Sequence, residues 1–65
     1  MSTLKYLERA EKYAEARGDT DGFLFHYNFC RESFSIQKSV WLALRWLYDE
    51  ETANLLQHQY WNPAL

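Results

Sequence analysis

The chain has 65 residues, 48% of them hydrophobic, 18% aromatic and 25% charged, with a formal net charge of −2. This composition excludes an intrinsically disordered chain, and the slight acidity argues against a nucleic-acid module that binds through charge alone. A single cysteine excludes an intrachain disulfide and is typical of a reducing compartment, and the charged N-terminal stretch lacks the apolar centre of a secretion signal. We therefore expect one domain over residues 1–65, located in the cytoplasm.

The N-terminal segment predicts a helix over residues 3–17. Ser2 or Thr3 can cap its start, because a short hydroxyl accepts a hydrogen bond from the first free N–H groups of a helix. Gly18 is a suitable residue for the position just after the last turn. The apolar side chains recur at intervals of three and four: Leu4, Leu7, Ala10 and Ala14.

The stretch "GFLFHYNFC", residues 22–30, fits two patterns. Alternation in twos is typical of a half-buried strand, whereas steps of three and four make one stripe of a helix. No glycine or proline occurs between Gly22 and Asn62, which favours helix, because sheet proteins need more turn residues. We predict a long helix over residues 20–48, with a kink or break near Ser33–Ser35 as the open alternative.

Two apolar stripes run along this predicted long helix. The first follows a heptad pattern, interrupted by Gln37, and is expected to form the core or a dimer seam: Phe23, Tyr27, Cys30, Phe34, Trp41, Leu44 and Tyr48. The second lies beside it: Phe25, Phe29, Ile36, Val40 and Leu47. Two stripes need two neighbours, and the first helix is too short to cover either completely.

Residues 50–60 predict a third helix or a continuation of the second, which Asn62-Pro63 ends. The fold class is therefore all-α, a helical hairpin that we expect to form a dimeric bundle, because a domain of this size buries little surface alone. The alternative is a monomeric three-helix bundle with partly exposed aromatic side chains.

An interaction with an unknown protein partner is the expected function. Trp and Tyr dominate the energetics of protein interfaces. The candidate partner-binding residues are Trp46, Tyr60 and Trp61. The last two, beside a proline, either fold back as a lid over the core or anchor a partner.

Catalytic chemistry has few candidate residues. His26 and Cys30 lie four residues apart and share a helix face, but structural zinc takes four ligands and a reactive thiolate needs an electropositive, accessible site. We expect no enzyme activity, metal or cofactor. The apolar segment at residues 39–48 is about half the roughly 20 residues that a membrane span needs, so no membrane is expected.

Nucleic acid is the alternative partner. Arg31, Lys38 and Arg45 recur at intervals of seven and would form one basic line along the polar face of the long helix. Such a line could contact phosphates, although it pairs more often with acidic neighbours. The low net charge makes nucleic acid the less favoured partner.

The segment "LERAEKYAEARGD", followed by a glycine-free aromatic half in a chain of this length, resembles the small accessory proteins of temperate lambdoid bacteriophages. No family motif is matched, so the resemblance assigns no residue. It implies a short helical domain that binds host proteins, without chemistry of its own, in the host cytoplasm. A regulatory role in phage development or host physiology would follow.

Overall fold

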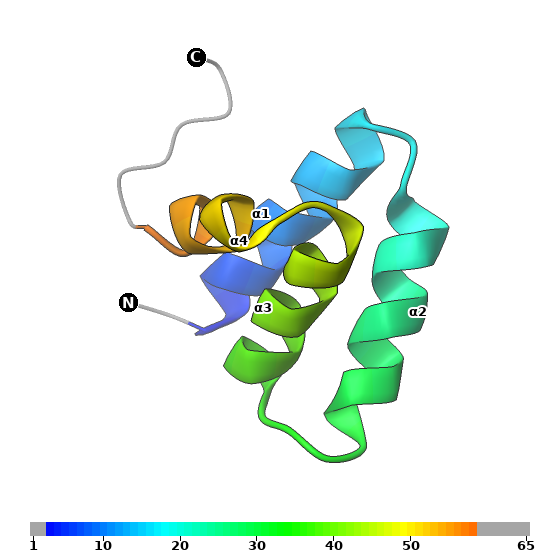
Figure 1. The fold of residues 1–65 in the computed structure, drawn as a ribbon, viewed down its shortest axis with the longest axis vertical. Coiled ribbons are helices and arrows are strands. Elements are labelled where there is room, and N and C mark those ends of the chain that lie inside the picture. Colours follow the sequence, from blue (N-terminus) through cyan, green and yellow to red (C-terminus); the bar gives the residue numbers. More distant parts are fainter. Residues whose placement is uncertain (1–2, 59–65) are drawn as a thin grey trace.

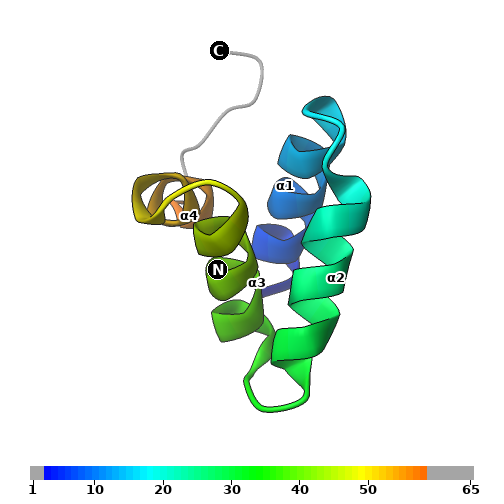
Figure 2. The same ribbon diagram turned by 45° about the vertical axis from the view of Figure 1, so that its right-hand side comes forward.

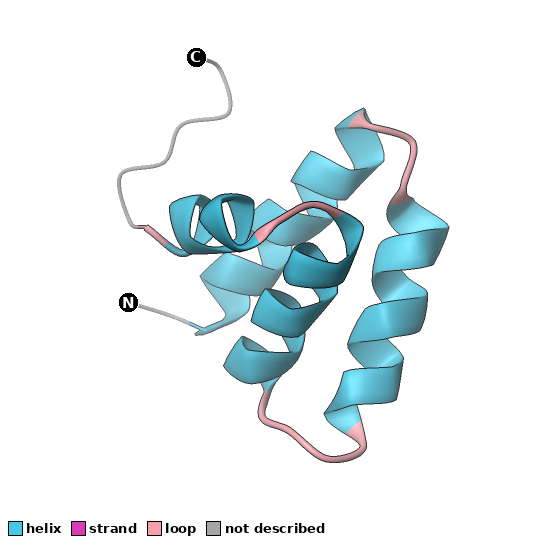
Figure 3. Ribbon diagram, in the orientation of Figure 1, coloured by secondary structure: helices cyan, strands magenta, loops and turns pink. Residues whose placement is uncertain are grey.

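The computed structural model describes residues 3–58, and within them all regular structure is helical (Figures 1 and 3). The helices are α1 (Thr3–Ala16), α2 (Thr20–Arg31), α3 (Ile36–Leu47) and α4 (Glu50–Gln57). The all-α prediction is confirmed, while the number of helices differs from the prediction.

The helices α2 and α3 lie side by side and run in opposite directions, which Figures 1 and 2 both show. The helix α1 packs against both of them, and α4 packs against α3 and α1 on the side away from α2. The core therefore lies between α1, the α2–α3 pair and α4.

The first helix ends where the sequence predicts. Gly18 has a φ of +76°, a left-handed conformation that glycine adopts without the steric cost of a Cβ atom. The Asp19 N–H then donates to the Ala14 carbonyl at 2.7 Å, and the Gly18 N–H donates to the Glu15 carbonyl at 3.1 Å. These two bonds satisfy carbonyls of the last turn and set the direction in which α2 leaves.

The predicted long helix over residues 20–48 is wrong, because the chain reverses at residues 32–35. The Cys30 carbonyl accepts from the N–H groups of Ser33 at 3.1 Å and Phe34 at 2.9 Å, which closes α2. Ser35 then caps α3, and its hydroxyl accepts from the Lys38 N–H at 3.3 Å. The break lies where the sequence left a kink open.

This reversal lets the apolar faces of α2 and α3 cover each other, which a single straight helix would prevent. Gly22 allows a close approach, because a Cβ atom there would lie 3.3 Å from Leu47 Cδ2. Among the described residues, none other than Gly18 has a positive φ. The turn at residues 32–35 therefore needs no glycine, and the sequence carries no glycine signal for it.

The helix predicted over residues 50–60 is present as α4, separate from α3 and spanning Glu50–Gln57. The Asp49 carboxylate accepts from the Thr52 N–H at 2.7 Å and so caps α4. Its hydrogen bonds with Thr52 lower the pKa of Asp49 below the usual carboxyl value. The end of the predicted helix falls beyond residue 58, outside the described residues.

The core is built from a few large side chains and several small ones. Alanines at contact points let the helix backbones approach closely. The fully or almost fully buried apolar residues are Tyr6, Ala10, Ala14, Phe23, Cys30, Val40, Ala43, Leu44, Ala53 and Leu56.

Polar side chains of α1 tie α4 to the bundle. The buried Tyr6 hydroxyl donates to the Ala53 carbonyl at 2.9 Å. Arg9 donates from Nε to the Leu56 carbonyl at 2.7 Å and from Nη2 to the Gln57 carbonyl at 3.3 Å. Carbonyls in the last turn of a helix have no partner within it, so the guanidinium stabilises the C-terminal end of α4.

A second polar cluster joins the α1–α2 turn to the end of α3. The Tyr48 hydroxyl donates to Asp19 Oδ2 at 2.8 Å, and the Tyr13 ring meets the Tyr48 ring edge-on at 5.1 Å. The Arg17 guanidinium lies 4.7 Å from the centre of the Tyr13 ring. The pKa of Tyr48 is raised to about 12, mainly by burial of the hydroxyl and secondly by its hydrogen bond with Asp19.

We predict that Tyr6→Phe lowers the free energy of unfolding by about 1–2 kcal/mol, because it removes the buried hydrogen bond between α1 and the Ala53 carbonyl of α4. Tyr27→Phe is the matched control, since the Tyr27 hydroxyl makes no hydrogen bond to any described residue. Urea unfolding followed by circular dichroism measures both. Equal effects of the two substitutions would contradict the prediction.

Alkaline pH is expected to destabilise the protein through Tyr48. The folded pKa of Tyr48, about 12, lies above the ordinary value of 10.0, so its contribution is fully present below pH 10 and is lost as the pH rises toward 12. Tyr48→Phe cannot ionise, and its free energy of unfolding should fall less steeply between pH 9 and pH 11. Parallel urea titrations measure the two slopes, and identical slopes would refute this role for Tyr48.

Candidate functional site

Three aromatic side chains form an exposed surface across α2 and α3. The exposed fractions are 70% for Phe25, 59% for Phe29 and 57% for Trp46. The rings of Phe29 and Trp46 lie 6.1 Å apart between centroids, so the surface is continuous from one helix to the other. We call Phe25, Phe29 and Trp46 the aromatic patch.

The position of the patch follows from the helical period of α2. Phe23 and Cys30 point into the core, and Phe25 and Phe29 stand four residues apart on a different side of the helix. A helix of about 12 residues can present only part of its circumference to the core. With aromatic residues on both sides of α2, one set remains in contact with solvent.

His26 lies between the members of the aromatic patch. Its ring meets the Trp46 ring at 4.6 Å and the Phe25 ring at 5.5 Å, both edge-on. The half-buried imidazole therefore packs against two of the exposed aromatic rings. Its Nδ1 atom is buried and makes no hydrogen bond to the described residues.

Charged side chains stand on both sides of the aromatic patch. On α2 and its end, the exposed Asp21 and Glu32 lie four residues before Phe25 and three residues after Phe29. These two carboxylates form the acidic edge. We infer this placement from the helical period: at about 100° per residue, Asp21 and Glu32 lie around the helix on the side of Phe25 away from Phe29. The Phe29 ring meets Trp46 of α3, so both carboxylates lie farther from α3 than the aromatic rings do.

The other side of the patch is basic: at about 100° per residue around α3, Lys38 and Arg45 follow Trp46 on the side away from α2. Lys38 Nζ and Arg45 Cζ lie 5.7 Å and 5.6 Å from the centre of the Trp41 ring, within the range of cation–π attraction. Neither cation forms an ion pair within residues 3–58. We call Lys38 and Arg45, which lie on the solvent side of α3, the basic edge.

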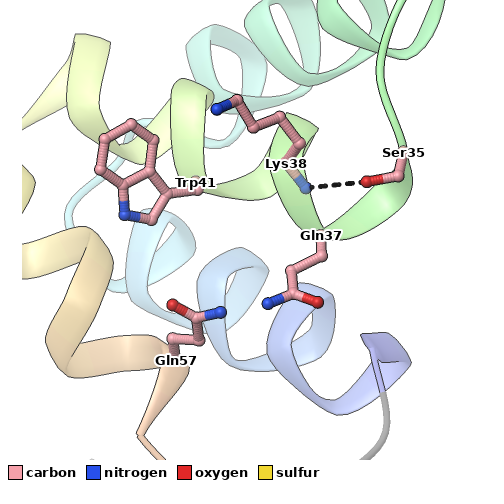
Figure 4. Close-up of a pocket in the computed structure, with 5 residues that line it drawn as sticks. All are labelled: Ser35, Gln37, Lys38, Trp41 and Gln57. Carbon is pink, nitrogen blue, oxygen red and sulfur yellow. Dashed lines mark hydrogen bonds between the residues drawn. The ribbon is translucent and has the colours of Figure 1, made fainter.

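Trp41 also lines an open pocket of about 320 Å³ between α3 and α4 (Figure 4). Its indole N–H donates to Asn54 Oδ1 at 2.9 Å. Figure 4 shows the pocket residues as sticks, together with the Lys38 N–H to Ser35 Oγ hydrogen bond. Gln37 and Gln57 line the rest of the pocket, so its surface combines polar atoms with the apolar face of Trp41.

His26 and Cys30, the reactive side chains that the sequence places on one helix face, are half-buried and buried, respectively. Cys30 is buried, and desolvation raises the pKa of its thiol, which disfavours the nucleophilic thiolate. Within residues 3–58, no three His, Cys, Asp or Glu side chains converge as metal ligands would.

The two predicted apolar stripes are each divided between core and surface. From the first, Phe23, Cys30 and Leu44 are buried; Tyr27, Trp41 and Tyr48 are half-buried; and Phe34 is exposed. From the second, Val40 is buried; Ile36 and Leu47 are half-buried; and Phe25 and Phe29 are exposed.

Of the predicted partner-binding residues, Trp46 is exposed and belongs to the aromatic patch. Tyr60 and Trp61 lie outside the described residues, so the choice between lid and anchor stays a prediction. The patch brings Trp46 together with Phe25 and Phe29, which the sequence assigned to a stripe.

The predicted basic line is wrong as one continuous line, because its residues lie on two helices. Arg31 ends α2, and its Nη1 donates to the Phe34 carbonyl at 2.6 Å. Lys38 and Arg45 remain together on α3, beside Trp41.

The sequence analysis placed neither Asp21 nor Glu32 in a candidate site and considered His26 only together with Cys30. The signal for the acidic edge was present in the spacing of Asp21, Phe25, Phe29 and Glu32. It could be used only once α2 was known to end before the next helix.

The chain matches no family model, no curated protein and no solved structure in the three comparisons with known proteins. Within residues 3–58, no helix is both long enough and apolar enough to cross a membrane. The aromatic patch is therefore interpreted from its own geometry.

The patch residues are expected to contribute little to stability. Phe25→Ser and Phe29→Ser should each change the free energy of unfolding by less than about 1 kcal/mol, because these side chains are mostly exposed. Phe23→Ala, on the same helix, should cost about 3–5 kcal/mol, because Phe23 is fully buried. Urea unfolding of the three variants tests this order, and a loss at Phe25 as large as at Phe23 would contradict it.

Proposed function

We propose that this protein is a small non-catalytic interaction protein that docks onto other protein surfaces through the aromatic patch. The supporting observation is that Phe25, Phe29 and Trp46 are all more than half exposed and adjoin one another across α2 and α3. Large aromatic side chains in such a position favour binding, because their burial removes apolar surface from water.

The size of the patch supports this proposal. A large aromatic residue carries about 150–250 Å² of surface, so the exposed fractions correspond to roughly 300–450 Å² from three side chains. Contiguous apolar patches of about 300–600 Å² are the largest that ordinary monomers show, and they are often functional. In a chain of 65 residues, such a patch is a large share of the surface.

The rigidity of the patch also favours docking. His26 packs against Phe25 and Trp46, and Phe29 packs against Trp46, so these rings hold one another in place before any partner binds. Pre-organised side chains lose less conformational entropy on binding. The patch also lies on two helices, which position side chains more firmly than a loop does.

For the biological setting, we propose a regulatory protein of a temperate bacteriophage that binds a host protein in the host cytoplasm. The resemblance of "LERAEKYAEARGD" and of the aromatic half to lambdoid accessory proteins is the support for this setting. The docking proposal depends on the patch and not on the setting.

The alternative function, a nucleic-acid-associated regulator, has one observation in its favour. Lys38 and Arg45 lie together on α3 without a carboxylate partner among the described residues. Two cations give a small phosphate-binding surface on a chain whose net charge is −2, so the protein-interaction proposal is preferred.

Substitution of the patch tests the proposal. The immobilised chain is exposed to native host lysate at low concentration, and the retained proteins are compared with those retained by Phe25→Ser/Phe29→Ser. We expect the double variant to lose the specific proteins by at least about tenfold, the effect of removing hot-spot aromatic residues.

Leu55→Ser is the matched control, because Leu55 is 53% exposed but lies on α4, away from the patch. It should retain the same proteins as the unmodified chain. Equal retention by the unmodified chain and the double variant would refute docking through the patch.

A further inference from the structure

The surface formed by α2 and α3 has three parallel bands. The acidic edge (Asp21 and Glu32) lies along α2, the aromatic patch lies in the middle, and the basic edge (Lys38 and Arg45) lies along α3. Because acidic and basic edges flank a common apolar centre, this surface carries the charges needed to complement itself.

The ends of these bands are also matched. Gly22 lies against Leu47, so the start of α2 is level with the end of α3, and Asp21 is level with the region of Arg45. The turn at residues 32–35 joins the other two ends, which places Glu32 at the level of Lys38. Each carboxylate therefore has a cation at its own height across the patch.

Two-fold symmetry turns this pattern into complementary contacts. Most homodimers have one two-fold axis, and both protomers use the same surface patch. An axis parallel to α2 and α3 places the aromatic patches face to face and brings the acidic edge of each protomer opposite the partner's basic edge. An axis perpendicular to the helices would instead place acidic edge against acidic edge and basic edge against basic edge.

The aromatic patch alone supplies about half of the area that each partner buries in a standard dimer interface. A standard interface buries about 800 Å² on each partner, with an apolar centre and a polar rim. The aromatic patch supplies roughly 300–450 Å² as the centre, and the edges with the residues between them form the rim. The arrangement has the apolar centre and charged rim that a protein interface needs.

We propose that the occupant of the aromatic patch is a second copy of this chain, with α2 of each protomer lying antiparallel across α3 of the other. In this dimer Asp21 faces the partner's Arg45, and Glu32 faces the partner's Lys38. The inference rests on the proposed docking role of the patch: the second copy occupies the patch in the isolated protein and leaves it when a host protein binds. It adds to that role the direction of the two-fold axis.

Sedimentation of the purified chain tests the first half of this proposal. We expect the mass to double between about 1 µM and 500 µM, a range that covers dissociation constants of ordinary homodimers. Phe25→Ser/Phe29→Ser should raise the dissociation constant at least tenfold with unchanged helix content by circular dichroism. Leu55→Ser should leave it unchanged.

Charge reversal tests the orientation. The acidic-edge variant Asp21→Lys/Glu32→Lys and the basic-edge variant Lys38→Glu/Arg45→Glu should each self-associate at least tenfold more weakly at low salt, because like charges then face each other. Mixing the two variants should restore association, now as a heterodimer. The restored affinity should fall as salt is added, since rim charges are screened.

A matched control separates specific pairing from general attraction between oppositely charged chains. Glu11→Lys/Glu15→Lys has the same net charge as the acidic-edge variant, but its exposed substitutions lie on α1. It should not form the heterodimer with the basic-edge variant. A heterodimer of equal affinity with this control would overturn the proposed pairing of edges.

The remaining outcomes are distinct. A chain that stays monomeric up to about 1 mM would overturn the second copy as occupant, while the lysate experiment would still judge docking through the patch. A dimer that forms but is indifferent to both edge reversals would overturn the proposed axis. A dimer insensitive to Phe25→Ser/Phe29→Ser would overturn the patch as the interface.

Discussion

The reversal of the chain at residues 32–35 is the constraint on which the rest of this structure depends. The Cys30 carbonyl closes α2, and the Ser35 hydroxyl opens α3, so two helices of 12 residues replace one long helix. Once α2 and α3 lie against each other, each can bury only one side. Phe23 and Leu44 enter the core, while Phe25, Phe29 and Trp46 remain in solvent.

The parts of the fold that the sequence predicts are those with a local chemical signal. Gly18 ends α1 because its left-handed conformation is accessible to glycine, and the acidic run from Asp49 marks the start of α4. The turn at residues 32–35 has no such signal, since its backbone angles are available to any residue. The only local signal for this turn is Ser35, which caps α3. Serine also occurs within helices, so it does not by itself predict a turn.

The sequence predicts that the candidate site contains exposed aromatic residues, but it does not predict which ones. A 65-residue chain with twelve aromatic residues cannot bury them all, and Trp46 was recognised as a candidate for partner binding. Which phenylalanines stay outside depends on the break, because a helical period continued across it groups Phe25 and Phe29 with the buried Val40. The same error joined Arg31 to Lys38 and Arg45 in one basic line. The helical period groups residues correctly within α2 and within α3. When it is continued through the turn at residues 32–35, it assigns residues of the two helices to the same face although they lie on different surfaces.

The hairpin of α2 and α3 also explains why the polar groups of the surface are arranged in bands. The acidic edge comes from α2 and its end, the basic edge comes from α3, and the exposed aromatic residues of both helices form the centre. The proposed docking function and the proposed dimer both use this arrangement. Neither would survive if α2 and α3 formed one rod, because the patch residues would then lie on distant parts of it.

The most direct test of this account is a nuclear Overhauser measurement between the Gly22 α protons and the Leu47 methyl groups. The sample is the Phe25→Ser/Phe29→Ser variant at low concentration, so that contacts within one chain are observed. The hairpin places Gly22 against Leu47 and predicts a strong signal. A continuous helix would separate the two residues by about 37 Å, at about 1.5 Å per residue, and the absence of the signal in a helical sample would contradict the account.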